Sequence, residues 1–185
     1  WQARYNRSSV AYRRSQPERS DAYAIASWLR IGELQVGQQP PAAFDKVKFI
    51  AALHEIRTLT VEPIEVFEPR LKELCAASGV TLLLTPAIPR ARVSGAARWV
   101  NGSPVIQLSL YGKKNDRFWF TFFHEACHIL NHSNKLVFLD EADDGDWSQE
   151  EQEANRFAEE WLIPAEVAHE LPQLSSREAV RQFAG

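Results

Sequence analysis

The chain has 185 residues, of which 45% are hydrophobic, so it can bury the core of one compact domain or of a domain with an added helical segment. The net charge is −3 and no cluster of lysines and arginines accompanies a motif, which argues against direct nucleic-acid binding by this segment. No signal peptide or membrane-spanning apolar run is visible, and Cys75 and Cys127 alone cannot build a secreted disulfide framework, so we expect a cytoplasmic protein.

The first part of the chain predicts three helices. A polar, arginine-bearing stretch at residues 1–15 precedes a helix signal at Ser20-Asp21. Apolar residues at helical spacing predict helices at residues 22–34, 45–59 and 64–78, and Gly79 suits the position just after a helix. We therefore predict an N-terminal helical segment, residues 1–79, before a second domain, residues 80–185. The side chains expected on the buried faces of the second and third helices are Val47, Phe49, Ile50, Leu53, Ile56, Val66, Phe67, Leu71, Leu74 and Cys75.

After Gly79 the hydrophobic period changes from 3.6 to 2, which is typical of strands. Strands are predicted at residues 80–84, 93–100 and 105–110, and Asn101-Gly102 is a strong hairpin signal between the last two. The predicted fold class is α+β, with a three- or four-stranded sheet packed on two later helices. An acidic stretch at residues 140–146 predicts a solvated loop, because it lacks the ligand spacing of an EF-hand calcium site.

The predicted helix at residues 117–132 contains an HExxH motif formed by His124, Glu125 and His128. On an α-helix the two histidines lie one turn apart on one face, where both imidazoles can reach one zinc ion. Zinc acidifies a bound water, and the neighbouring Glu125 can accept its proton. Burying such polar side chains in an apolar helix is costly unless they are paired or bind metal, so two incidental histidines are the weaker interpretation. The motif predicts a metallohydrolase.

A catalytic zinc usually has a third protein ligand, and the helix that begins after Ser148 is its best source. Glu151 and Asn155 share one flank of the predicted buried face of that helix, whereas Glu153 points away. We predict Glu151 as the third ligand and Asn155 as a hydrogen-bond partner of a ligand histidine. Ser148 and Glu151 also fit a capping box, in which Glu151 would return to the backbone and Glu150 would be the alternative ligand.

Three residues near the motif have open roles. His132 continues the i, i+4, i+8 series, but it lies about 12 Å from His124 along the helix axis, so we expect it to support the site rather than to bind metal. Cys127 is expected to be a packing residue rather than an oxidant sensor. Tyr111 is expected to be an interface residue rather than a hydrogen-bond donor to the transition state.

Across roughly residues 80–171, the order and spacing of these segments resemble the ImmA/IrrE-type metallopeptidase domain. The resemblance is carried by residues 104–109, the HExxH helix, residues 151–158 and Leu162-Ile163-Pro164, whereas Cys127 stands where the family commonly has glycine. It implies that His124, His128 and Glu151 bind zinc, or manganese or iron, and that Glu125 is the catalytic base. It further implies a gluzincin-like endopeptidase whose protein substrate is a repressor in a stress, prophage or toxin-antitoxin circuit.

Alternatives to this interpretation stay open. The domain could instead be a non-proteolytic sensor in a DNA-binding regulator, with a structural or vestigial zinc site, although a structural site needs no general base such as Glu125. Residues 1–79 could be a separate interaction module. Because the chain begins on Trp1, we expect a fragment or processed product with an upstream or fused helix-turn-helix domain. An extended substrate is expected to pair with an exposed edge strand at residues 95–99.

Overall fold

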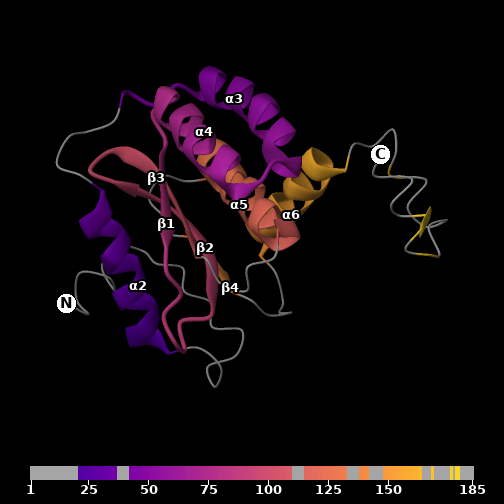
Figure 1. Cartoon of the computed structure of the whole chain (residues 1–185). Coiled ribbons are helices and arrows are strands. Elements are labelled where there is room, and N and C mark those ends of the chain that lie inside the picture. The colour runs from indigo at the N-terminus through magenta and orange to yellow at the C-terminus, as the bar shows by residue number, and fades with distance from the viewer. Residues whose placement is uncertain are drawn as a thin grey trace.

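The computed structural model of the protein describes residues 21–36, 42–109, 115–132, 138–141 and 148–163, with a few single positions after residue 163. None of the helices in these residues is long and apolar enough to cross a membrane. The elements labelled in Figure 1, with the short 3-10 turn η1, are α2 (Ala22–Gln35), α3 (Lys46–Thr58), η1 (Leu59–Val61), α4 (Ile64–Ala77), β1 (Thr81–Thr85), β2 (Val93–Val100), β3 (Ser103–Ser109), α5 (Asn115–Asn131), β4 (Phe138–Glu141) and α6 (Gln149–Leu162).

The predicted α+β class and the three N-terminal helices are confirmed. Asp21 and Asp45 cap α2 and α3 by accepting hydrogen bonds from backbone N–H groups in the first turn of each helix. Gly79 follows α4 with a φ of 81°, the left-handed conformation that glycine adopts without strain. The predicted buried faces were too wide, because Val47, Ile50 and Val66 are 77%, 38% and 49% exposed.

The four strands form one sheet in the order β1-β3-β2-β4, in which β1 is parallel to β3 and the other neighbouring pairs are antiparallel. The predicted hairpin joins β2 to β3, and Asn101 and Gly102 both have the positive φ that its tight turn requires. The predicted edge strand is wrong, because residues 95–99 belong to β2, which is bonded to β3 on one side and β4 on the other. The first two residues of the predicted acidic loop lie in β4, and residues 142–146 lie outside the described residues.

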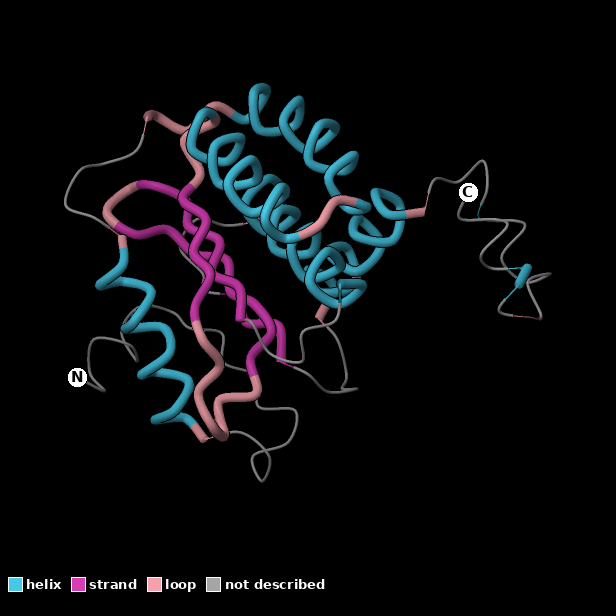
Figure 2. Tube along the Cα trace, viewed as in Figure 1, coloured by secondary structure: helices cyan, strands magenta, loops and turns pink. Residues whose placement is uncertain are grey.

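The sheet lies between two layers of helix. Figure 1 and Figure 2 show α2 on one side of the sheet and α3, α4, α5 and α6 together on the other. Because α3 and α4 share their core with α5 and the sheet, the helices on either side of residue 80 form one packed layer; the division into two domains at this residue stays a prediction. The largest fully buried side chains of this core are Phe49, Leu53, Ile56, Leu71, Ile106, Leu108, Phe122 and Phe123.

The other face of the sheet holds a buried polar network beneath α2. Arg98 of β2 donates from Nη2 to the Gln107 side-chain oxygen at 2.6 Å and to the Leu29 carbonyl at 3.0 Å. Gln107 of β3 donates in turn to the Trp28 carbonyl and to the Thr85 hydroxyl. These bonds tie the α2 backbone to the side of the sheet opposite α5.

Candidate metal centre

Helix α5 carries the HExxH motif through the middle of the core. Its apolar side chains recur with helical period, and those that are less than a tenth exposed are Trp119, Phe122, Phe123, Ala126, Cys127, Ile129 and Leu130. The three polar motif residues are as buried as their apolar neighbours, with His124 1%, Glu125 0% and His128 2% exposed. Polar groups this deep need partners, so their contacts define what the site can do.

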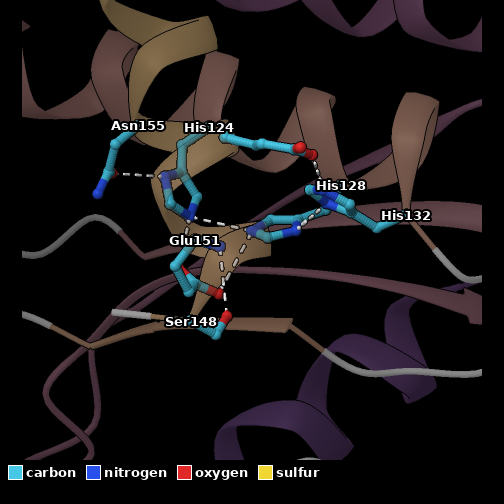
Figure 3. A network of polar contacts seen from close by, with 7 residues as sticks. His124, His128, His132, Ser148, Glu151 and Asn155 are labelled. Atoms are coloured by element: carbon cyan, nitrogen blue, oxygen red, sulfur yellow. Dashed lines mark hydrogen bonds and ion pairs between the residues drawn. The ribbon is translucent and has the colours of Figure 1, made fainter. Parts of the chain in front are cut away.

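His124 and His128 converge with Glu151 of α6, as Figure 3 shows. The two Nε2 atoms lie 3.1 Å apart, His124 Nε2 is 3.1 Å from one Glu151 carboxylate oxygen, and His128 Nε2 is 3.5 Å from the other. Donor atoms around a tetrahedral zinc at about 2.05 Å are separated by roughly 3.3 Å. Two imidazole nitrogens and a carboxylate at these separations fit a divalent metal ion.

The neutral form of His128 suits this task. Burial, together with the nearby His124 and His132, lowers the pKa of the His128 imidazole to about 2. A neutral imidazole keeps a lone pair on one nitrogen, which is the form that binds a metal ion.

At the start of α6, the two candidate glutamates, Glu150 and Glu151, have different contacts. The Ser148 hydroxyl caps the helix by accepting from the Glu151 backbone N–H at 3.4 Å. The neighbouring Glu150 carboxylate accepts hydrogen bonds from its own backbone N–H and from Ser148, and these lower its pKa. Only the backbone half of the predicted capping box involves Glu151, since its carboxylate lies beside the two histidines. This placement favours Glu151 over Glu150 as the third metal ligand.

Each motif histidine has its Nε2 atom beside Glu151 and a second partner at its other ring nitrogen, Nδ1. The Asn155 side-chain oxygen lies 3.0 Å from His124 Nδ1, which confirms the predicted contact between Asn155 and a motif histidine. His132 Nδ1 lies 2.8 Å from His128 Nδ1, and His132 Nε2 lies 3.1 Å from a carboxylate oxygen of Glu153. His132 thus contacts His128, as expected of a supporting residue. The Glu153 side chain is exposed, as expected, and its contact with His132 was not predicted.

Glu125 lies on a different face of α5, against strand β2. A methyl group built on Gly95 would come within 2.6 Å of the Glu125 Oε1 atom and 2.5 Å of the Thr121 Cγ2 atom. The buried carboxylate thus fills the space above a glycine of the interior strand β2. This role of Gly95 was not predicted from the sequence, where its only signal is a glycine inside a strand pattern, which often marks a close approach.

Of the other residues of interest, Cys127 and His54 are described in the structure, whereas Tyr111 and Pro164 are not. Cys127 is a free, buried thiol, and burial raises its pKa to about 11, as expected of a packing residue. His54 of α3 packs its ring against Trp161 of α6. Tyr111 and Pro164 lie outside the described residues.

The chain matches the family model described as the IrrE N-terminal-like domain, a peptidase family, over residues 80–184, which is more than half of its length. No curated protein and no solved structure matches it significantly. The matched region contains the sheet, the HExxH helix and α6. The expected ImmA/IrrE-type metallopeptidase domain is therefore confirmed, and the chain belongs to the family of IrrE N-terminal-like domains.

Proposed function

We propose that the protein is a zinc-dependent endopeptidase that hydrolyses a peptide bond in a regulatory protein, such as a transcriptional repressor of a stress, prophage or toxin-antitoxin circuit. The observation that carries the proposal is the convergence of His124, His128 and Glu151 donor atoms at 3.1 to 3.5 Å. The buried Glu125 next to them in the motif favours catalysis over a purely structural site, which needs no general base.

In this proposal His124, His128 and Glu151 hold the metal, and Glu125 moves the proton. A bound zinc ion would acidify a water molecule and polarise the peptide carbonyl. Glu125 accepts one proton from the attacking water as its oxygen bonds to the carbonyl carbon. When the C–N bond breaks, Glu125 returns that proton to the leaving nitrogen, so that water is added across the bond and Glu125 is regenerated.

The donor set favours zinc, since two imidazoles and one carboxylate are ligands of known catalytic zinc sites. Manganese or iron can use the same donors, and metal supply partly decides which ion is bound. The free thiols of Cys75 and Cys127 fit a reducing compartment, in keeping with a cytoplasmic location.

For substrate recognition, β4 replaces the strand that the sequence suggested. Within the described sheet, β4 is bonded to β2 only, so its outer edge can pair with an extended peptide. A peptide added there would continue the sheet past β4, on the side away from β2. Backbone pairing would supply affinity without demanding one particular side chain.

The catalytic proposal is tested with Glu125→Gln, which keeps the shape of the side chain but cannot accept a proton. Metal-loaded wild type and variant are incubated with a helix-turn-helix repressor encoded beside this protein and with a library of quenched fluorescent peptides. We expect discrete fragments only with the wild type and equal zinc content in both proteins. Undiminished cleavage by the loaded variant would contradict the mechanism, and zinc binding by a wild type that cleaves nothing would favour a sensor role.

The ligand set is tested separately by metal content. Glu151→Ala is expected to lose zinc on dialysis, whereas Glu150→Ala, which removes the neighbouring carboxylate, is expected to retain it. Retention by the Glu151 variant with loss by the Glu150 variant would reverse the assignment of the third ligand.

A further inference from the structure

We infer that Glu153 and His132 position His128 for metal binding through a directed chain of hydrogen bonds that runs from the surface of α6 to the proposed metal site. This inference rests on the metal site of the proposed function. The hydrogen-bond chain connects two helices, because His128 is on α5, His132 directly follows the last residue of α5, Asn131, and Glu153 is on α6. Its two contacts are 2.8 Å between the histidine Nδ1 atoms and 3.1 Å from His132 Nε2 to the Glu153 carboxylate.

The direction of each hydrogen bond follows from the chemistry of the site. His128 Nε2 points at Glu151 and His124, so binding a metal there requires the ring proton to be on Nδ1. His128 Nδ1–H then donates to His132 Nδ1. His132 consequently carries its own proton on Nε2 and donates it to Glu153, which can only accept. Each ring nitrogen of His128 and His132 is thus assigned one role, as metal ligand, hydrogen-bond donor or hydrogen-bond acceptor.

This chain of hydrogen bonds leads from a solvent-exposed side chain to a fully buried one. The Glu153 side chain is 53% exposed, that of His132 is 6% exposed, and that of His128 is 0% exposed. A hydrogen-bonded carboxylate at the far end makes the His132 Nδ1 lone pair a stronger acceptor, which makes the His128 imidazole a stronger ligand and fixes its ring orientation. His124 is held differently, because its Nδ1 partner is the neutral amide of Asn155.

The inference is tested by measuring zinc dissociation constants in competition with a chelator. His132→Phe keeps a flat ring but removes both nitrogens, and we expect it to weaken zinc binding by about 10- to 100-fold. Glu153→Ala is expected to weaken binding in the same direction by a smaller factor. Because Glu153 acts through His132, Glu153→Ala should have no further effect in the His132→Phe background.

His132→Asn tests whether restoring only the acceptor for His128 recovers part of the zinc affinity. Its amide oxygen can take the place of Nδ1 as acceptor for His128, but it offers no atom at the place of Nε2. We expect zinc affinity between those of the wild type and His132→Phe, with no dependence on Glu153. The visible absorption spectrum of the cobalt-substituted protein should shift in His132→Phe, because the orientation of a ligand imidazole changes.

Two control variants each remove one histidine or one carboxylate that is not part of this chain of hydrogen bonds. His54→Phe removes a histidine on α3, Glu160→Ala removes an exposed carboxylate from α6, and neither should alter zinc affinity. Thermal unfolding of each metal-free variant checks that the fold is intact. Zinc affinity of His132→Phe within twofold of the wild type, or additive effects of the two substitutions, would overturn the inference. Failure of the proposed metal site itself would look different, since the wild type would then bind no zinc.

Discussion

Glu125 lies above Gly95 of β2, where a side chain would displace the Glu125 carboxylate. Any Cβ at residue 95 would meet both the Glu125 carboxylate and the Thr121 methyl group. The carboxylate is at the end of a flexible side chain and can move, whereas the β-branched Thr121 has less freedom. A larger residue at 95 would thus act on the proposed base rather than on the metal donors.

Gly95→Ala is therefore expected to lower kcat for peptide hydrolysis by on the order of 100-fold, because a displaced base no longer reaches the attacking water. Zinc affinity should stay within about twofold of the wild type, since the substitution does not touch the histidines or Glu151. Steady-state kinetics and chelator competition measure the two quantities. A variant with full kcat would show that the position of Glu125 does not depend on Gly95.

Between elements, the first residue of α3 is tied to the end of the HExxH helix. Lys46 Nζ donates to the Leu130 carbonyl at 2.7 Å, at the C-terminal end of α5, where the last carbonyls have no partner further along the helix and the helix dipole is negative. His54 and Trp161 add a ring contact between α3 and α6. The N-terminal helices thus help to hold the two helices that carry the proposed metal donors.

Lys46→Met keeps the apolar stem and removes the charged donor. We expect it to lower the free energy of unfolding by about 1 to 2 kcal/mol, the usual range for a partly buried charge-assisted bond at a helix end. Lys48→Met, two residues further along α3 and exposed, is the matched control and should change stability by less than about 0.5 kcal/mol. Urea unfolding measures both, and equal losses would mean that the Lys46 bond contributes nothing specific.

For the whole molecule, helix α2 closes the face of the sheet opposite the metal site through buried polar contacts. Gln107 is 0% exposed and Arg98 is 4% exposed, and both bond to backbone carbonyls of α2. A buried cation is costly without its acceptors, so the network specifies how α2 sits on the sheet. The opposite side of the same strands supports α5.

Gln107→Leu removes the amide that accepts from Arg98, and we expect a loss of about 3 kcal/mol in the free energy of unfolding. Replacing the charge as well, in Arg98→Met with Gln107→Leu, should restore part of that stability, because the poorly solvated cation is gone. Chemical denaturation of the single and double variants measures the coupling free energy between Arg98 and Gln107. If the stability losses of the two single variants simply added up in the double variant, Arg98 and Gln107 would not act as one network.

Metal binding should stabilise the molecule as a whole. At free zinc of about 100 times the dissociation constant, linkage adds about 2.7 kcal/mol, which is roughly 5 to 10 °C in Tm for a chain of this size. Zinc is expected to raise the Tm of the wild type, a chelator to reverse the rise, and Glu151→Ala to show neither change. An identical zinc response in Glu151→Ala would place the bound ion elsewhere.

By itself the amino-acid sequence determined the features that depend on neighbours a few residues apart. Helical periodicity places His124 and His128 one turn apart, and the Asn101-Gly102 pair forms the tight turn of the hairpin. The three N-terminal helices follow from the same local rule. The division at residue 79 and the roles of the predicted metal donors stay predictions.

Only the tertiary structure decided which distant segments meet. Strand β2 is central rather than at the edge because β4, from beyond α5, pairs with its other side. The crossing of α5 and α6 brings Glu151 to the motif histidines and Glu153 to His132, although both glutamates are on one short helix. Sequence periodicity defines the faces of a helix but not the angle at which two helices cross, and that angle selects the side chains that touch.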